Sequence, residues 1–262
     1  TATKYFRAVV TSGVCSSATS ATATISVNSV TWNGIAWSNV TGPTSTTAAI
    51  IAGNYNVSAN INACTLTINN NAVVTIPSEY NVTLNGALTV SSGSFTLENN
   101  ANLIQTSNAA NTGNIIVKRN SSALLRLDYT LWSSPVTNNT SLFLQSFSPA
   151  TSTNRFYNYG TSTNQYTVIG NPSTTNFSLG KGYLIRMPND ASSTVRTNYL
   201  GVFTGVPNNG IIPITMSNEG VGKRFNLIGN PYPSPISMAQ FVADNNTTIT
   251  GTLYFWRKTN NA

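Results

Sequence analysis

A phrase of four residues recurs between Cys64 and Gln105: one variable position, then an apolar residue, a threonine and a second apolar residue. Successive phrases start roughly seven residues apart, and turn-forming Asn, Gly, Ser and Pro residues separate them. Because side chains alternate along a strand, the two apolar residues share one face and the threonine takes the other. The pattern predicts the short strands of a β-solenoid. The phrases occupy residues 65–68, 73–76, 81–84, 87–90 and 94–97, with a degraded copy at 101–104.

The phrases predict an apolar column inside the solenoid and a polar outer face, because a register shift of one residue would expose the whole apolar set. Terminal coils of a solenoid need caps, and we interpret Trp32 and Trp37 as the cap of this column. Stacking on sugars is their alternative role. The predicted inward residues are Leu66, Ile68, Val74, Ile76, Val82, Leu84, Leu88, Val90, Phe95, Leu97 and Leu103, and the predicted outward ones are Thr67, Thr75, Thr83, Thr89 and Thr96.

The segments on either side of the solenoid also read as β-structure, so the predicted fold class is all-β. Residues 1–28 hold two strand-like runs, 5–11 and 21–27, around a turn. Residues 29–112 hold the solenoid, which we interpret as a stalk. Residues 113–262 are rich in aromatic residues, and their short strands alternate with turns as in an antiparallel β-sandwich. The clearest strands there are 114–119, 182–187, 225–228 and 251–256, with one short helix at 237–242.

The composition excludes most classes of catalytic site. The chain contains no histidine, the commonest general base and metal ligand. Its six acidic residues are scattered along the sequence, so no local calcium-binding loop exists. A glycosidase pair assembled from acids that are distant in sequence stays open as the catalytic alternative. We therefore predict a protein that is not an enzyme and that holds no cofactor and no metal.

Charge and cysteine content limit the classes of binding partner and the covalent links that we expect for this chain. The net charge is +7, but only 7% of the residues are charged, against a typical ~25%. The basic residues are dispersed and no nucleic-acid-binding motif accompanies them, so we expect no nucleic-acid partner. Attraction to an anionic polysaccharide or an acidic cell surface fits this charge better. No apolar stretch is long enough to span a bilayer. A bridge between Cys15 and Cys64 stays open.

Several phrases of the third segment occur in the order found in a known family. This series resembles a module of large exported Flavobacterium-type proteins of the Bacteroidetes, where the module lies just before the C-terminal sorting domain. The solenoid is similar to the segment that commonly precedes that module, and residues 1–28 resemble the last two strands of an Ig-like repeat in surface proteins of the same group. The phrases are LDYTLWSSPV (127–136), FSPAT (147–151) with RFYNY (155–159), GKGYLIRMP (180–188) and FNLIGNPYPSPIS (225–237), and in the earlier segments TSGVCSSATS (11–20), ATATISV (21–27), TWNGIAWSNVT (31–41) and NNANLIQT (99–106).

The resemblance implies export through the type IX secretion system and a secreted or cell-surface location. Many proteins of this kind are adhesins, and some are associated with gliding motility. It also implies contact with the secretion machinery during export, through a sorting domain that these residues do not include. The sequence starts as if in the middle of a domain, so we expect a piece of a longer exported protein.

Two groups of residues are candidate sites. Tyr157, Tyr159 and Tyr166 flank a polar stretch and are candidate contacts for a polysaccharide or surface glycan, with core or cross-strand packing as the alternative. The second group, Asn230, Pro231, Tyr232 and Pro233, predicts a rigid structural turn, because proline restricts the backbone of its own residue and of the residue before it.

We expect this turn to connect strand 225–228 to the short helix, with Tyr232 against the aromatic core. A cis bond before Pro233 is considered because cis prolines occur in tight turns. Asp128 lies among aromatic residues, so we expect it to be buried and bonded to backbone N–H groups or to an arginine.

These observations favour a non-catalytic structural and adhesive segment of a secreted or cell-surface protein. The alternative function is a carbohydrate-binding module attached to a secreted polysaccharide-degrading enzyme. Exposed, coplanar aromatic rings near Asn or Gln would favour the alternative, and buried aromatic rings would favour the structural segment.

Overall fold

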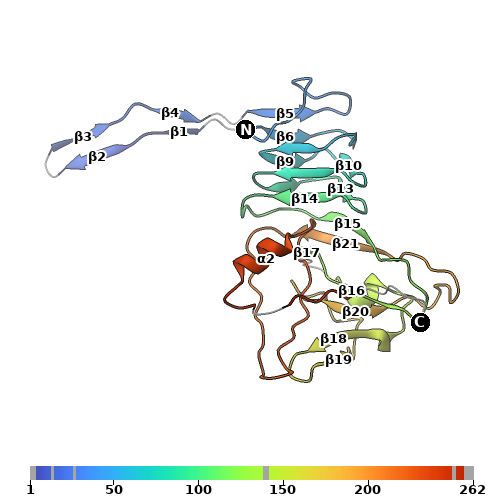
Figure 1. The fold of residues 1–262 in the computed structure, drawn as a ribbon. Helices are drawn as coiled ribbons and strands as arrows, with labels where there is room; N and C mark the ends of the chain where they lie inside the picture. Colours follow the sequence, from blue (N-terminus) through green and yellow to red (C-terminus); the bar gives the residue numbers. More distant parts are fainter. Residues whose placement is uncertain (1–3, 13–14, 26–27, 138–141, 250–251, 257–262) are drawn as a thin grey trace.

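Strands that alternate apolar and polar residues every second position bury one face by winding into a coil and stacking coil on coil. In a computed structural model that describes residues 4–12, 15–25, 28–137, 142–249 and 252–256, the chain does this over residues 29–105. An antiparallel ribbon precedes the solenoid, and a region of mixed strands and long loops follows it (Figure 1). The predicted all-β class and the β-solenoid are confirmed.

The ribbon consists of four short strands in two antiparallel pairs. Strand β1 (Lys4–Phe6) pairs with β4 (Ala23–Ile25), and β2 (Val9–Ser12) pairs with β3 (Cys15–Thr19). The predicted run 5–11 therefore contributes to both pairs, whereas the run 21–27 contributes only β4, and strand β3 is not predicted. The register shifts between Val10 and Ser12. The Ig-like assignment of residues 1–28 stays a prediction.

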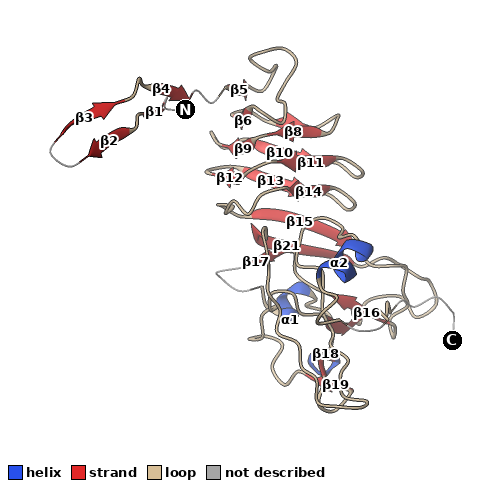
Figure 2. Ribbon diagram, turned by 60° about the vertical axis from the view of Figure 1, so that its left-hand side comes forward, coloured by secondary structure: helices blue, strands red, loops and turns tan. Residues whose placement is uncertain are grey.

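In the solenoid, three strands make one coil, so hydrogen-bonded neighbours from β6 to β14 are three strands apart in sequence, whereas β5 pairs with β6, the next strand of the chain. Three parallel ladders result, β5-β6-β9-β12, β8-β11-β14 and β7-β10-β13, which form the three faces of the rod (Figure 2). Corresponding phrase positions stack in register, for example Leu66 on Leu88 and Thr75 on Thr96. The strands are β5 (Ser29–Trp32), β6 (Ala48–Ile51), β7 (Tyr55–Asn56), β8 (Ile61–Ala63), β9 (Thr65–Ile68), β10 (Val73–Ile76), β11 (Asn81–Leu84), β12 (Leu88–Val90), β13 (Ser94–Leu97) and β14 (Asn102–Gln105).

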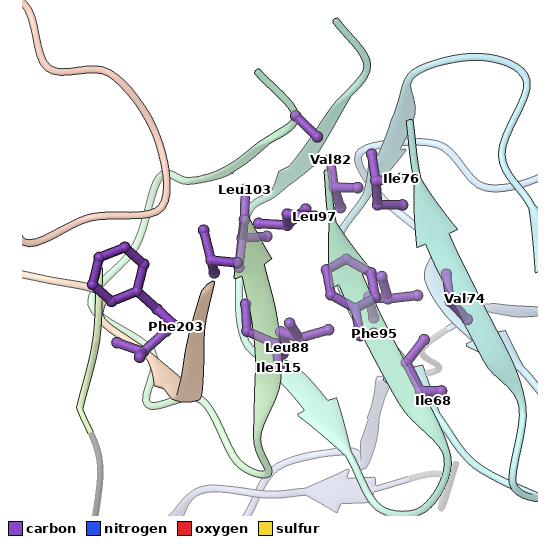
Figure 3. Packing of buried hydrophobic residues seen from close by; sticks show 14 of the residues in the cluster. Ile68, Val74, Ile76, Val82, Leu88, Phe95, Leu97, Leu103, Ile115 and Phe203 are labelled. Carbon is purple, nitrogen blue, oxygen red and sulfur yellow. The ribbon is translucent and has the colours of Figure 1, made fainter. Parts of the chain in front are cut away.

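The predicted inward residues form the column, as Figure 3 shows for the part near its C-terminal end. All of them are fully or almost fully buried except Val90, which is half-buried against the core at the end of β12. The five predicted outward threonines lie outside the core and are half-buried, because each sits between neighbours in the coils on either side. The orientation predicted from the phrases is therefore confirmed.

The first coil is covered by aromatic side chains. Trp32 and Trp37 lie with ring centroids 5.8 Å apart, and Tyr55 packs on both, at 4.5 Å from Trp32 and 5.6 Å from Trp37. The Nε1–H of Trp32 donates to the carbonyl oxygen of Asn54 at 2.9 Å. Both tryptophans are packed against the buried cluster, which agrees with their interpretation as a cap.

Asparagine side chains tie the corners of one coil to the backbone of the next. The Oδ1 atoms of Asn60, Asn54 and Asn99 accept from the backbone N–H groups of Asn81, Val73 and Asn120, at 2.8 to 2.9 Å and 19 to 21 residues further along. These bonds satisfy backbone donors where the ladders are interrupted at the corners. One corner also requires glycine: Gly93 has φ +92°, and a Cβ atom there would lie 2.2 Å from the carbonyl oxygen of Ala72.

Strand β15 (Ile115–Asn120) connects the solenoid to the third segment. It pairs in parallel with β13 and antiparallel with β21 (Leu200–Pro207), and β17 (Val136–Thr137) adds to the far edge of β21. One six-stranded sheet thus runs from β7 through the solenoid into the third segment. The predicted boundary at residue 112/113 is therefore not a break in this sheet.

A second, antiparallel sheet has the order β16-β20-β18-β19. Trp132, Phe147 and Phe203 pack between this region and β21, with ring centroids 4.9 to 6.2 Å apart. Gly201 leaves the room they need, since a Cβ atom there would lie 2.8 Å from both Phe147 and Trp132. The elements are β16 (Tyr129–Trp132), β18 (Phe156–Gly160), β19 (Gln165–Val168), β20 (Tyr183–Arg186), helix α1 (Leu144–Phe147), a 3₁₀ turn at Thr153–Arg155 and helix α2 (Met238–Asp244).

Two of the predicted strands are wrong. Residues 225–228 make only one bridge, Lys181 to Ile228, and residues 252–256 have no strand pairing. A strand needs a partner along its length, and the Gly-Asn-Pro sequence at 229–231 ends the first run after that bridge. The predicted helix is confirmed as α2, whose N-terminal Ser237 accepts from the N–H of Gln240 at 3.3 Å. The strands predicted at 114–119 and 182–187 correspond to β15 and β20.

Replacing a residue of the column should destabilise the whole rod. Phe95 is fully buried, so Phe95→Ala should lower the free energy of unfolding by about 3–5 kcal/mol, the range for truncating a buried phenylalanine. The control is Val73→Thr on the outer side, where the valine is 50% exposed; the change there should stay within about 0.5 kcal/mol. Urea unfolding measures both, and equal losses would contradict the assigned register.

Candidate functional site

The three sequence-predicted tyrosines lie together on one face of the antiparallel sheet. Tyr157 and Tyr159 are two residues apart on β18, and Tyr159 lies directly opposite Tyr166 on the edge strand β19. Tyr129 of β16 joins them, because its ring packs against that of Tyr157 at 5.8 Å. We call these four residues the tyrosine face.

The rings of the tyrosine face form two tilted pairs. Tyr159 and Tyr166 lie with centroids 5.3 Å apart and their planes at 67°, and Tyr129 and Tyr157 also meet at 67°. Tyr166 is 41% exposed, while Tyr157 and Tyr159 are half-buried. The Tyr159 hydroxyl donates to Oδ1 of Asn164 in the β18–β19 turn. The tyrosine face is accessible to a ligand, but its rings are not coplanar.

Two arginines bring positive charge to the tyrosine face. Arg155 precedes β18 and donates from Nη1 to the hydroxyl of Tyr157 at 3.3 Å, while Arg186 of β20 lies opposite Tyr129 in the ladder. Partial burial, followed by the hydrogen bond with Tyr157, raises the pKa of Tyr129. Partial burial acts in the same direction on Tyr157, but the hydrogen bonds from Arg155 and Tyr129 and the two arginine charges outweigh it and lower the pKa of Tyr157. The face therefore offers aromatic contact together with cationic donors.

The acidic residues in the buried or half-buried regions have structural partners. Oδ2 of Asp128 accepts from the N–H of Leu125 at 3.0 Å and pairs with Nη1 of Arg196 at 3.2 Å, as the sequence predicted. Glu98 pairs with Lys118 at 2.7 Å, between the last full coil and β15. Within the described residues, no cluster of three His, Cys, Asp or Glu side chains could hold a metal ion. Cys64 is a free thiol.

The second predicted group, Asn230 to Pro233, forms a turn with many internal and external bonds. Oδ1 of Asn230 accepts from the N–H of Tyr232 at 2.9 Å, and its Nδ2 donates to the carbonyl oxygen of Ser234 at 2.7 Å. Pro231 and Pro233 are buried. The bond between Tyr232 and Pro233 is trans, so the cis alternative is wrong. The Tyr232 hydroxyl donates to the carbonyl oxygen of Gly210 at 2.6 Å.

This turn lies on the open edge of the solenoid. The carbonyl oxygen of Pro233 accepts from the N–H of Leu103 in β14 at 3.1 Å, where a further coil would otherwise pair. An unpaired strand edge invites association with other chains. The turn thus covers part of the edge that the last coil leaves open.

Residues 24–262 match the family described as Domain of unknown function (DUF8693), and residues 1–29 match Domain of unknown function (DUF8696). The chain belongs to the DUF8693 family. No curated protein and no solved structure matches it. In the part of this DUF8693 chain that the structure describes, no helix has the length and apolar character to cross a membrane.

Arg119 is a structural residue of this DUF8693 chain that the sequence did not reveal. It lies at the end of β15, and its Nη2 donates to the carbonyl oxygens of Ala101 at 2.8 Å and Pro233 at 3.1 Å. Its Nη1 donates to the carbonyl oxygens of Lys118 at 2.7 Å and Glu98 at 3.3 Å. Burial lowers the pKa of Arg119. The sequence places Arg119 only beside Lys118, as a weak basic pair, and no local signal distinguishes it.

Removing the guanidinium of Arg119 should loosen the C-terminal end of the solenoid. Arg119→Met keeps the apolar stem but leaves carbonyl oxygens without their donor, so we expect a loss of about 2 kcal/mol in the free energy of unfolding. Arg224 is exposed, and Arg224→Met is the matched control, with an expected change within about 0.5 kcal/mol. Urea unfolding at constant slope measures both. An unchanged midpoint for Arg119→Met would show that the solenoid end is closed without it.

The turn itself is tested at its prolines. Pro233→Ala frees a buried backbone position and should lower the free energy of unfolding by about 1 kcal/mol, although the carbonyl bonds to Leu103 and Arg119 can still form. The exposed Pro235 is the control, and Pro235→Ala should have a smaller effect. Equal melting temperatures for the wild type and Pro233→Ala would mean that this stretch is only a linker.

Proposed function

We propose that this chain is a non-catalytic structural and adhesive segment of a large secreted or cell-surface protein. On this proposal the parent protein belongs to the Bacteroidetes, leaves the cell through the type IX secretion system, acts outside the cell and is associated with gliding motility. The solenoid is the stalk, and the third segment carries the adhesive surface. Residues 1–28 are the end of an Ig-like domain, and residues 113–262 form a sandwich-type module.

The observation that carries the proposal is the continuity of the core. One cluster of buried side chains extends from Ala49 in the first coil to Phe203 of β21, and includes Trp132 and Phe156 of the antiparallel sheet. Parallel coils joined in this way resist bending, because each is fixed to its neighbours by a ladder and by shared apolar contacts. The tyrosine face therefore has a fixed position at the end of a rod, which suits a stalk that presents a contact surface.

The second candidate function is a carbohydrate-binding module of a secreted polysaccharide-degrading enzyme. The accessibility of the tyrosine face supports it, because four aromatic side chains that bear hydroxyl groups line one side of a sheet, but the rings lack the coplanar arrangement that would favour it most. Aromatic rings with a polar tip are suited to contacts that are partly apolar and partly wet. The two functions differ in the parent protein and share this surface.

The adhesive function is tested by coupling the purified chain to beads and measuring their retention on cells and on polysaccharide-coated surfaces. Tyr159→Ala/Tyr166→Ala should abolish most of the retention, because it removes the outer ring pair. Tyr254 is 75% exposed and is not part of the tyrosine face, so Tyr254→Ala is the matched control and should retain the beads. Retention that persists in the double variant would contradict the assignment of the surface.

The non-catalytic part is tested on the same polysaccharides. We expect no release of reducing ends by the wild-type chain, and turnover that disappears in a Glu98→Gln or Asp128→Asn variant would overturn it. Export is tested separately: a tagged parent protein should be accessible to protease on intact cells, and should lose that accessibility in a strain without the type IX system.

A further inference from the structure

We propose that the tyrosine face binds a single chain of a uronic-acid polysaccharide, with Arg155 and Arg186 pairing its carboxylates. The inference rests on the proposed glycan contact at this face and names its ligand class. It depends on three observations: where the arginines lie, which carboxylates are absent from the face, and how the rings are tilted.

Both arginines have unused donors next to the rings. Among the described residues, Arg155 bonds only tyrosine hydroxyls, principally that of Tyr157 at 3.3 Å. The Nη2 of Arg186 donates to Oδ1 of Asn189 and to Oγ of Ser152, and its Nε is buried without a partner in the described part of the chain, so Nη1 is the donor that remains for a ligand. A guanidinium that keeps free N–H groups is suited to a carboxylate. Arg155 can bind one through two parallel hydrogen bonds, and Arg186 can add a bond from Nη1.

No acidic side chain of the described residues neutralises these arginines. Asp128 is paired with Arg196, and Glu98 with Lys118. Asp190, the acidic residue nearest to Arg186 in sequence, forms no ion pair with it in the described residues and lines a hollow of about 320 Å³ together with Tyr199 and Pro149. The positive charge at the tyrosine face is therefore available to a ligand, and the net charge of +7 would speed the approach of a polyanion.

The tilt of the rings favours a single soluble polysaccharide chain over a flat crystalline surface as the ligand. A flat crystalline polysaccharide is matched by coplanar rings, whereas both ring pairs here meet at 67°. The tyrosine face extends across all four strands, from Tyr129 on β16 to Tyr166 on β19, which is about 14 Å at ordinary strand spacing. This length fits an oligosaccharide stretch of one soluble chain better than a single sugar.

The experiment compares polygalacturonate with its methyl ester, which has the same backbone without the charge. Affinity electrophoresis of the full chain at low salt should show retardation by polygalacturonate and at least tenfold weaker retardation by the ester. Arg155→Gln should weaken polygalacturonate binding roughly tenfold, since a hydrogen bond to a charged group is lost. Tyr166→Ala should weaken binding of both polymers. Arg7→Gln removes the same charge from an exposed site in the N-terminal ribbon, between β1 and β2, and should bind as the wild type does.

Each alternative result identifies what fails. Equal loss in Arg155→Gln and Arg7→Gln would mean that net charge alone attracts the polymer, and would overturn the site. Equal binding of the acid and its ester, lost in Tyr166→Ala, would overturn the acidic specificity and leave the glycan contact. Absence of binding to either polymer, with bead retention still dependent on Tyr159 and Tyr166, would overturn the uronate ligand and leave the adhesive function. Thermal melting of each variant confirms that it is folded.

Discussion

The structure depends on closing both ends of a column of parallel strands. Inside the solenoid every strand has a neighbour on each side, but the first and last coils expose backbone donors, acceptors and apolar side chains. At the N-terminal end, Trp32, Trp37 and Tyr55 cover the column. At the C-terminal end the chain reverses direction, because β21 pairs antiparallel with β15 and places Phe203 under the last coil. The aromatic packing and the tyrosine face of the third segment follow from this closure.

The sequence predicts well those features that depend on the local alternation of apolar and polar side chains along a strand. Leu66, Phe95 and the threonines between such residues have the orientation expected of them, because a strand offers only two faces. The number of strands in a coil depends on which phrase stacks on which, and the corner bonds from Asn60 to Asn81 and from Asn99 to Asn120 fix that over 21 residues. These are long-range choices that no single phrase contains. Strand β21 escapes prediction because Gly201 and Gly205 interrupt its pattern, although its partners require both to be small.

The candidate surface likewise combines residues that are close in sequence, which can be predicted, with residues that only tertiary packing brings together, which cannot. Tyr157, Tyr159 and Tyr166 are close in sequence and can be recognised as a group, but Tyr129 and Arg186 reach them only through the pairing of β16, β20 and β18. The Asn230–Pro233 turn is recognisable from its prolines, whereas its position against Leu103 and Arg119 comes from tertiary packing. The low charged content of 7% fits the corners of the solenoid, because asparagine side chains there supply hydrogen bonds that in other proteins charged side chains could make.

The direction of the hydrogen bonds in the solenoid has a mechanical consequence. They run along the axis of the rod from coil to coil, so a pull on its two ends loads them one layer at a time, as in unzipping. A coil repeats after 21 residues at its corner bonds, and its release adds up to about 70 Å of extended chain while the remaining coils keep their own contacts. A solenoid built in this way is stiff against bending and extensible under tension, and it can yield one coil at a time.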